Sequence, residues 1–300
     1  MHIYQNIISK TPIDKGWSGD QKYCAVTADG AKYLLRITSS ERAHRFYLGY
    51  LRMLEVAALG VSMCLPIEFG QCSEGTYAIH SWVDGVDAEG YIPTLPVEKQ
   101  YAYGVDAGRI LRKLHTLPAP ADVMPWSERF NAKIDRKIAI YDACELKYES
   151  GDAAFLKFIA ENRHLLRGRP QSYQHGDYHI GNMMIDKAGV LTIIDFDRDD
   201  FGDPWEEFNR IVWCAQAAPS FASGMVDGYF DGEVPMEFWK LLALYICSNT
   251  LSSLPWAIPF GEKEIQVMRN QASQVLEWYD GMKHVVPAWY RNKRCVWNEE

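Results

Sequence analysis

The sequence lacks the features of a membrane, secreted or disulfide-bonded protein. No run of eighteen apolar residues occurs in its 300 residues, and residues 1–6 have neither the basic nor the apolar region of a signal peptide. The seven cysteines are scattered and never form a C-x-x-C pair, unlike those of disulfide frameworks and zinc sites. We therefore expect a cytoplasmic protein with reduced thiols, no membrane contact and no structural metal.

The chain also lacks an excess of positive charge. It has 31 Lys and Arg residues against 39 Asp and Glu residues, a formal net charge of −8. Binding of nucleic acid needs clustered basic side chains that displace counterions, so we expect no nucleic-acid partner. A negative surface mildly favours cationic partners. The 48% of hydrophobic residues, without repeats or low-complexity tracts, predicts a folded protein with a substantial core.

Residues 183–194 predict a β-hairpin. Two apolar runs, 183–185 and 191–194, flank Asp186-Lys187-Ala188-Gly189, which has the length and the glycine of a hairpin turn. A hairpin turns the chain back on itself. Residues before its first strand and after its second are therefore expected to lie close together.

Three polar side chains flank this hairpin. Asp177 and Asn182 lie on the loop that enters it, and Asp195 follows its second strand. Two carboxylates and an amide that converge are costly unless a cation neutralises them. An all-oxygen set of this kind suits Mg²⁺, with phosphates and water as the remaining ligands.

The spacing of these residues matches a known motif pair. His175-x-Asp177-x-x-x-x-Asn182, followed by Asp195-Phe196-Asp197, has the frame of H-R-D-x-x-x-x-N and D-F-G in protein kinases. With glycine after the histidine and Asp197 as the third residue of the second motif, the pattern resembles the aminoglycoside phosphotransferase family, the small-molecule branch of the protein-kinase-like fold. The resemblance extends from Gly16-Trp17-Ser18-Gly19 to Gly202-Asp203-Pro204.

The resemblance implies an α+β fold with two lobes. Residues 1–84 would form a small N-lobe with an antiparallel sheet that covers the nucleotide. Residues 85–300 would form a larger, mainly helical C-lobe with the catalytic loop and the acceptor site.

The resemblance also implies roles for the residues of the motif pair. Asp177 would be the catalytic base that orients and deprotonates the acceptor hydroxyl, and Asn182 and Asp195 would hold Mg²⁺. His175 would orient the catalytic loop through a hydrogen bond, and Asp197 would be a second supporting residue.

The nucleotide, ATP or GTP, would bind to the N-lobe. The Ser18-Gly19 turn would cover its phosphates with backbone N–H groups, and Arg36 would hold them where the family has lysine, because arginine is permanently charged and bidentate. Lys22 or Lys32 is the alternative cation. The base would bind the backbone around three residues, Ser81, Trp82 and Val83.

Apolar spacing and helix-start signals predict most of the remaining elements. The helix over residues 41–59 is expected to offer Glu41 or Glu55 as partner of the phosphate-holding cation. Asp203 and Pro204 have the N-cap and first-turn residues of a helix over 205–213, which favours a structural role for Asp203. Further helices are expected over residues 100–117, 125–143 and 153–166 and within 237–290.

Together these features predict an enzyme that moves the γ-phosphoryl group of ATP or GTP to a hydroxyl of a small molecule. We expect a cationic, aminoglycoside-like acceptor, and hence a role in antibiotic resistance, because residues 142–152 contain four acids and only one lysine, Lys147. Trp256 and Trp278 would add cation–π contacts if they face the acceptor. Three alternatives remain: a choline-like or amino-sugar metabolite kinase, a nucleotide-binding regulatory module with weak catalysis, and a metal-dependent hydrolase built on His175, Asp177 and His179.

Overall fold

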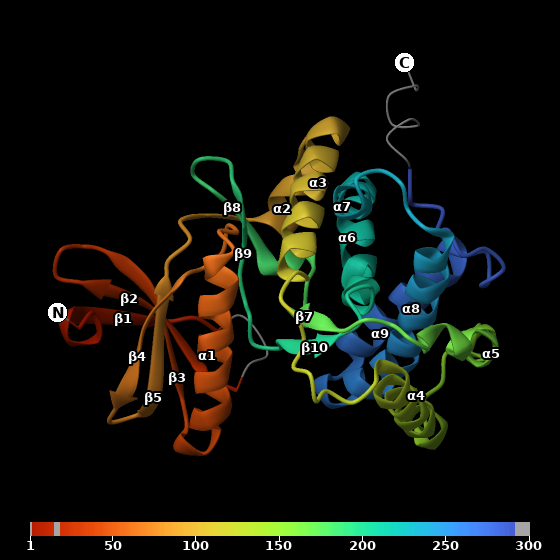
Figure 1. Cartoon of the computed structure of the whole chain (residues 1–300), viewed down its shortest axis with the longest axis horizontal. Helices are drawn as coiled ribbons and strands as arrows, with labels where there is room; N and C mark the ends of the chain where they lie inside the picture. Colours follow the sequence, from red (N-terminus) through yellow and green to blue (C-terminus); the bar gives the residue numbers. More distant parts are fainter. Residues whose placement is uncertain (1, 15–18, 292–300) are drawn as a thin grey trace. The chain divides into compact units, whose positions relative to one another are not determined.

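The computed structural model describes residues 2–14 and 19–291. The chain divides into two compact units (Figure 1). Unit 1 comprises Met1–Tyr91, His175–Asp177 and Gly181–Asp199, and unit 2 comprises Ile92–Gln174, Tyr178–Ile180 and Asp200–Glu300. The hairpin of the motif pair thus packs with the N-terminal residues. The lobe boundary between residues 84 and 85, which follows chain order, stays a prediction.

Unit 1 contains an antiparallel sheet of five strands in the order β1-β2-β3-β5-β4. This N-terminal sheet confirms the α+β class expected from the sequence. A helix, α1 (Ala43–Ala58), follows β3 and is preceded by the short 3₁₀ turn η2 (Ser40–Arg42). The strands are β1 (Ile7–Pro12), β2 (Gln21–Thr27), β3 (Lys32–Thr38), β4 (Pro66–Cys72) and β5 (Gly75–Ser81), with the 3₁₀ turn η1 (Tyr4–Asn6) before them.

The two faces of this sheet differ because side chains alternate along each strand. One face carries the apolar core of unit 1, made by Ala25, Leu35, Ile37, Tyr77 and Ile79. The opposite face, which we call the polar face, carries Arg36, Ala78 and His80, each of which is next to a core residue in its strand. It also carries Lys22, the register partner of Arg36. Helix α1 lies against the polar face.

A second sheet of unit 1 has three short strands in the order β6-β8-β9. The hairpin expected from the sequence is confirmed, since β8 (Met183–Asp186) and β9 (Leu191–Ile193) pair antiparallel. β6 (Gly85–Asp87) pairs with β8 and leads into α2 (Ala88–Tyr91), while η5 (Ile180–Asn182) precedes β8.

The chain that follows α1 is joined to β9. The N–H of Cys64 donates to the carbonyl oxygen of Ile193 over 3.0 Å, and the N–H of Ile193 donates to the carbonyl oxygen of Ser62 over 3.0 Å. The hydroxyl groups of Ser62 and Thr192 lie 2.8 Å apart. These bonds connect the end of the helix to the strand that precedes Asp195.

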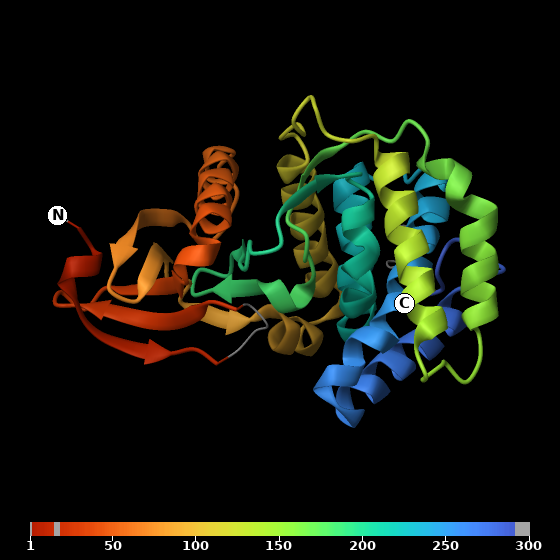
Figure 2. The same cartoon turned by 90° about the horizontal axis from the view of Figure 1, so that it is seen from below.

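Unit 2 is mainly helical (Figure 2). Its two strands, β7 (Ser172–Gln174) and β10 (Asp200–Gly202), pair antiparallel. The helices expected over residues 100–117, 125–143 and 153–166 are confirmed, the last of them ending in a 3₁₀ turn. The helices are α3 (Val97–Leu114), α4 (Trp126–Ala143), α5 (Asp152–Asn162), α6 (Ile211–Ala217), α7 (Pro219–Phe230), α8 (Met236–Ala257) and α9 (Glu262–Trp278), and the 3₁₀ turns are η3 (Ile92–Thr94), η4 (Arg163–Leu166), η6 (Glu206–Arg210) and η7 (Ile258–Phe260).

Helices α3 and α7 approach each other through glycines spaced four residues apart on both helices. A Cβ atom added at Gly104 would lie 2.1 Å from the carbonyl oxygen of Phe221, and one added at Gly228 would lie 2.2 Å from that of Val105. The missing side chains therefore allow the two backbones to touch, as small residues do at close helix crossings. Gly108 and Gly224 complete the seam.

The helix expected over residues 205–213 differs from the prediction. Its first part, η6, is 3₁₀, and α6 begins only at Ile211. Asp203 is fully buried, and its Oδ1 accepts a bond from the N–H of Trp205 over 3.0 Å. Its carboxylate also accepts bonds from Arg169 Nε and Nη2 over 2.7 and 2.9 Å and from the Tyr245 hydroxyl over 2.5 Å. Both carboxylate oxygens of Asp203 are thus occupied by structural partners.

One helical stretch within residues 2–14 and 19–291, Met236–Phe260, is long and apolar enough to cross a membrane. In its most apolar window, 67% of the residues are buried inside the protein. The stretch comprises α8 and η7 and forms a core helix of unit 2.

Candidate active site

Four hydrogen bonds form a closed ring in unit 1. The ring joins the loop of residues 175–182, which we call the motif loop, to the end of the hairpin. The amide nitrogen of Asn182 donates to the carbonyl oxygen of Asp177 over 2.9 Å, and the N–H of Asp177 donates to Nδ1 of His175 over 3.3 Å. Nε2 of His175 lies 3.0 Å from the carbonyl oxygen of Ile194, whose N–H donates to the carbonyl oxygen of Asn182 over 3.0 Å. The ring holds Asp177 and Asn182 beside the residue that precedes Asp195.

The hydrogen-bonded ring also indicates the tautomer of the buried His175. Because Nδ1 accepts a bond from a backbone N–H, Nε2 must carry the proton that is donated to Ile194. This assignment follows from the bonding pattern. The aromatic ring of Phe196 lies edge-on to the imidazole, with the two ring centroids 4.6 Å apart. His175 therefore has the contacts of an orienting residue.

Gly176 permits the close passage of the motif loop over the segment after the hairpin. Its φ angle is +81°, in the left-handed region that favours glycine. A Cβ atom at this position would lie 1.9 Å from the carbonyl oxygen of Arg198. The next residue, Asp177, has its Oδ2 atom 3.9 Å from Nε of Arg198. The glycine thus lets the Asp177 carboxylate lie near a guanidinium.

Asp195 has a strained backbone and a cationic neighbour. Its φ angle is +66°, which is unusual for a residue other than glycine and is found where a site requires it. Its Oδ2 atom lies 3.5 Å from Nζ of Lys22. The tight turn aims the residues after β9 back toward the polar face of the large sheet.

The residues Asn182 and Asp195 fit a magnesium ion. A carboxylate and an amide oxygen are hard ligands of the kind Mg²⁺ takes, with phosphate and water oxygens in the other positions. The nitrogen of the Asn182 amide donates to the carbonyl oxygen of Asp177, so the amide oxygen is the atom of this side chain that could hold a metal. The hydrogen bond between the Ile194 N–H and the Asn182 carbonyl places both residues at the same end of the hairpin.

Arg36 is the buried cation of the polar face. Its Nη2 pairs with Oδ2 of Asp20, and its Nη1 pairs with Oδ1 of Asp197. Burial by itself would lower the pKa of the Arg36 guanidinium, but the carboxylates of Asp197, Asp20 and Asp195 outweigh burial and raise that pKa. Asp20 is also paired with Arg42 over 2.8 Å. Arg36 thus lies in a compact cluster of alternating charges.

The prediction that Glu41 or Glu55 pairs with this cation is wrong. The ion pairs of Arg36 within the described part of the chain are made with Asp20 and Asp197, whereas Glu41 and Glu55 are exposed. Glu41 precedes α1. The residues that α1 turns toward the polar face are Phe46, Gly49, Tyr50 and Met53, which recur at helical spacing and leave Glu55 on another side of the helix.

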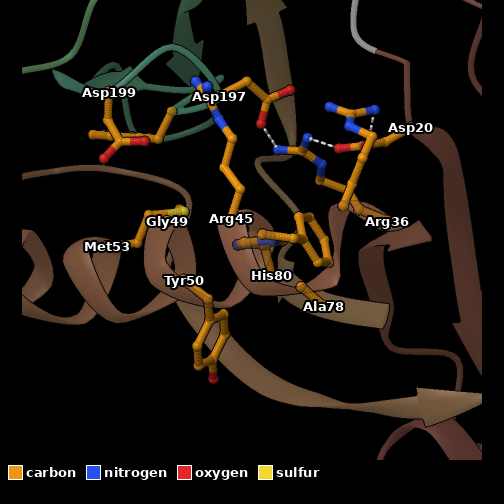
Figure 3. A pocket seen from close by; sticks show the side chains of 13 residues that line it. Asp20, Arg36, Arg45, Gly49, Tyr50, Met53, Ala78, His80, Asp197 and Asp199 are labelled. Carbon is orange, nitrogen blue, oxygen red and sulfur yellow. Dashed lines mark hydrogen bonds and ion pairs between the residues drawn. The ribbon is translucent and has the colours of Figure 1, made fainter. Parts of the chain in front are cut away.

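A cavity of about 50 Å³ lies between α1 and the polar face (Figure 3). His80 borders it with 3% of its surface exposed, and neither ring nitrogen has a hydrogen-bond partner within the described residues. Burial, together with the positive charge of Arg36, lowers the pKa of His80 to about 3. His80 is therefore a neutral imidazole at physiological pH. The Tyr50 ring lies edge-on to it, with the centroids 6.4 Å apart.

Apart from Arg36, the residues expected to bind the nucleotide that the structure describes lie in two places, just before β2 and at the end of β5. Ser18 lies outside the described residues, and Gly19 lies next to Asp20 at the start of β2. The N–H of Ser81 is used by the sheet, because it donates to the carbonyl oxygen of Leu65 over 2.8 Å. The next two residues, Trp82 and Val83, are half-buried.

The acidic segment 142–152 belongs to unit 2. Lys147 donates to three backbone carbonyls, of Tyr141, Asp142 and Cys144, rather than to carboxylates. Three of the four acids, Asp142, Glu145 and Glu149, are exposed. The segment therefore presents uncompensated negative charge. Of the two tryptophans proposed to contact a cation, Trp256 is 42% exposed and Trp278 is half-buried.

Sequence reasoning missed two charged residues of the site, Asp20 and Arg198. Asp20 is 2% exposed at its side chain and holds Arg36 from the side opposite Asp197. Its signal is weak, because an aspartate after a glycine reads as an ordinary turn residue. Arg198 directly follows Asp195-Phe196-Asp197, and no sequence pattern distinguishes it from the polar residues around it.

The model of the family described as "Phosphotransferase enzyme family" matches residues 10–239 of the chain. No curated protein matches the sequence. Solved structures do match over nearly the whole chain, at identities that establish the fold alone.

Three of these structures illustrate the range. A thermostable mutant of aminoglycoside phosphotransferase APH(4)-Ia, in a ternary complex with ADP and hygromycin B, is 15% identical with a TM-score of 0.64 and covers 92% of this chain and 96% of its own. An aminoglycoside 2'-phosphotransferase-IIIa mutant in complex with GDP is 13% identical with a TM-score of 0.67 and covers 92% and 94%. A choline/ethanolamine kinase family protein from Mesorhizobium loti is 17% identical with a TM-score of 0.63 and covers 92% and 91%. The fold expected from the sequence, protein-kinase-like with an N-terminal antiparallel sheet and a helical C-terminal region, is thereby confirmed.

Proposed function

Because the chain belongs to the Phosphotransferase enzyme family and is a small-molecule phosphotransferase, we propose that it moves the γ-phosphoryl group of ATP or GTP to a hydroxyl group of its acceptor. The observation that supports this reaction is the hydrogen-bonded ring that joins His175, Asp177, Asn182 and Ile194. It brings a carboxylate and an amide to the end of a hairpin where a second carboxylate, Asp195, begins the next turn.

In the proposed reaction, the acceptor oxygen attacks the γ-phosphorus. A new oxygen–phosphorus bond forms, the bond between the γ-phosphorus and the bridging oxygen breaks, and the nucleoside diphosphate leaves. The carboxylate of Asp177 accepts the hydroxyl proton, and its rigid attachment to the ring orients the hydroxyl for attack. The Arg198 guanidinium places positive charge near that carboxylate, with its Nε atom 3.9 Å from Asp177 Oδ2.

Asn182 and Asp195 would hold Mg²⁺, which would supply positive charge that neutralises the phosphates of the nucleotide. The hydrogen bond to the Asp177 carbonyl fixes the Asn182 amide through its nitrogen, and the carboxylate of Asp195, at the left-handed turn, lies 3.5 Å from Lys22 Nζ. Lys22 and Arg36 place positive charge beside the carboxylates of Asp195 and Asp197.

We place the nucleotide on unit 1, with the phosphates near the polar face and the base near residues 81–83. The lobe roles of residues 1–84 and 85–300, the contribution of Ser18 and Gly19, and the base contacts of Ser81, Trp82 and Val83 belong to this proposal. In support, the carboxylates and cations required for a metal-bound triphosphate are all found in unit 1.

The acceptor we propose is cationic and aminoglycoside-like. The support is the acidic segment 142–152 of unit 2, where Lys147 is engaged by backbone carbonyls and leaves Asp142, Glu145 and Glu149 to act on ammonium groups. A cytoplasmic location and a role in antibiotic resistance would follow from such an acceptor.

A choline-like or amino-sugar kinase is the second candidate. It is favoured by the fold itself, which the choline/ethanolamine kinase family protein shares to the same degree as the aminoglycoside phosphotransferases. Both candidates have a cationic acceptor, so the charge of unit 2 does not separate them.

The experiment is a screen for Mg²⁺-dependent consumption of ATP and GTP with aminoglycosides, macrolides, choline and amino sugars as acceptors. We expect acceptor-dependent nucleoside diphosphate release with a cationic compound and its loss on chelation of the metal. Absence of consumption with all acceptors, together with absence of nucleotide binding in calorimetry, would reject the proposed function.

A further inference from the structure

Lys22 and Arg36 lie directly opposite each other on neighbouring strands. They are register partners in the antiparallel pair of β2 and β3, so both side chains project from the polar face of the sheet. Their side chains are 12% and 7% exposed. The sheet therefore presents two cations, and not one, to the segment that contains Asp195 and Asp197.

The two cations are held very differently. Arg36 has both terminal nitrogens committed, one to Asp20 and one to Asp197, and its Nε–H is buried (Figure 3). Because Asp20 is itself almost fully buried, withdrawing Arg36 would leave its carboxylate away from water with Arg42, which is half-exposed, as its remaining ion-pair partner among the described residues. The guanidinium is thus fixed in place as the link between the β2 end and Asp197.

Among the described residues, the ion pairs of Lys22 are longer than those of Arg36. Its Nζ atom lies 3.5 Å from Asp195 Oδ2 and 4.0 Å from Asp197 Oδ2, beyond the usual 2.7–3.2 Å of a hydrogen bond. The ammonium group is attracted to both carboxylates without being committed to either. Its three N–H donors and flexible stem allow it to turn toward a third anion that arrives at Asp195.

We infer that Lys22, and not Arg36, is the cation that binds the nucleotide phosphates. Arg36 is then a positioning residue that holds Asp197. This inference rests on the proposed function, because the phosphates reach Lys22 only if Asp195 holds the metal that carries them. It also moves the phosphate-binding lysine from the third strand of the sheet to the second, where the chain provides a lysine.

The test compares nucleotide affinity in variants with side chains of similar length. Lys22→Met keeps most of the stem and removes the charge, and Lys10→Met on the adjacent strand β1 is the control, because Lys10 is paired on the surface with Glu74. Calorimetry measures Kd for Mg·ATP and Mg·GTP and for adenosine and guanosine, which have no phosphates.

For Lys22→Met we expect Kd for the preferred triphosphate to rise about 10- to 100-fold, as for loss of one charged hydrogen bond, with the nucleoside Kd unchanged. Lys10→Met should bind like the wild type. Lys22→Arg should restore most of the affinity, which separates a charge effect from a folding defect. Arg36→Met should lower the melting temperature and kcat and should raise the triphosphate Kd less than Lys22→Met does.

Two results would overturn the assignment: wild-type triphosphate affinity in Lys22→Met, or an equal loss for the triphosphate and the nucleoside. A larger loss of triphosphate affinity in Arg36→Met, at a temperature where that variant is folded, would also overturn it. If the wild type itself neither binds nor consumes a nucleotide, the proposed function fails and the assignment fails with it. Wild-type consumption with an unaffected Lys22→Met variant rejects the lysine assignment alone.

Discussion

Nε2 of His175 lies 3.0 Å from the carbonyl oxygen of Ile194. This bond joins the residue two positions before Asp177 to the residue immediately before Asp195, although the two are distant in sequence. The proposed base and the proposed metal ligand are therefore positioned by one imidazole.

Asp177→Ala is predicted to lower kcat by roughly 10²- to 10⁴-fold and to leave nucleotide Kd nearly unchanged, because a base and orienting group acts mainly in the transition state. Asp177→Asn should lose a similar factor, since the amide keeps the shape but accepts no proton. Steady-state kinetics and calorimetry measure the two quantities. Near-wild-type turnover in both variants would remove the role of Asp177.

Asp195→Ala is predicted to abolish the dependence of nucleotide binding on Mg²⁺. The carboxylate is the one charged protein ligand that we assign to the metal, and an alanine cannot replace it. Titration calorimetry with and without Mg²⁺ measures the effect, with the surface variant Glu74→Ala as control. An unchanged metal dependence in Asp195→Ala would mean that the cation is bound elsewhere.

His80 is predicted to make the protein sensitive to acid. Its folded-state pKa of about 3 is below its ordinary value, so between pH 6.5 and 3 the unfolded chain binds a proton that the folded chain does not. Its contribution to stability is complete above pH 6.5 and is lost as the pH falls toward 3, at about 1.4 kcal/mol per pH unit.

Urea unfolding at several pH values measures this effect. The slope of the unfolding free energy between pH 6.5 and 5 should be smaller by about that amount in His80→Leu than in the wild type. His44→Gln, on the exposed side of α1, is the matched control and should keep the wild-type slope. Equal slopes in His80→Leu and the wild type would show that His80 is solvated or protonated in the folded protein.

Asp203→Ala is predicted to cost about 3–5 kcal/mol of unfolding free energy, because it leaves the Arg169 guanidinium without its bidentate partner and removes the acceptor of the Tyr245 hydroxyl. Glu74→Ala breaks an exposed pair with Lys10 and should cost less than about 1 kcal/mol. Chemical denaturation compares the two variants. A loss below 1 kcal/mol in Asp203→Ala would contradict the structural role.

Acceptor KM is predicted to rise with ionic strength if the acceptor is cationic. Salt shortens the reach of exposed charges from about 10 Å at 0.1 M to about 3 Å at 1 M. Replacing both Glu145 and Glu149 by glutamine should raise KM at low salt and weaken its salt dependence. A salt-insensitive KM, or a neutral or anionic best acceptor, would reject the cationic acceptor and leave the phosphoryl-transfer reaction untouched.

The parts of the site that sequence predicted are local in the chain. The hairpin over residues 183–194 needs only its turn and two apolar runs, and those are contiguous. The convergence of Asp177 and Asn182 with the end of β9 follows from the hairpin, because pairing returns the chain to its starting point. The roles of Asp177, Asn182 and Asp195 come from the resemblance to the family and remain proposals.

The parts that sequence did not predict depend on register between distant segments. The turn at Asp29-Gly30 predicts the hairpin of β2 and β3, which the structure confirms, but the partnership of Arg36 with Asp20 depends on side-chain contacts that have no sequence signal of their own. Helical spacing argues against Glu55 as the partner of Arg36, because Glu55 lies off the stripe formed by Phe46, Gly49 and Met53. The sequence did not predict that the helix begins with the 3₁₀ turn η6, because 3₁₀ and α turns favour the same residue types.

The bonds between residues 62–64 and β9 make Cys64 an internal reporter of motion. Burial raises the pKa of its thiol to about 12, so at neutral pH a thiol reagent reacts only when this segment opens. The same segment connects the end of α1 to the strand that precedes Asp195. The labelling rate of Cys64, referred to the half-buried Cys24 and Cys72, therefore measures how often the helix separates from the strand that leads to the proposed metal ligand.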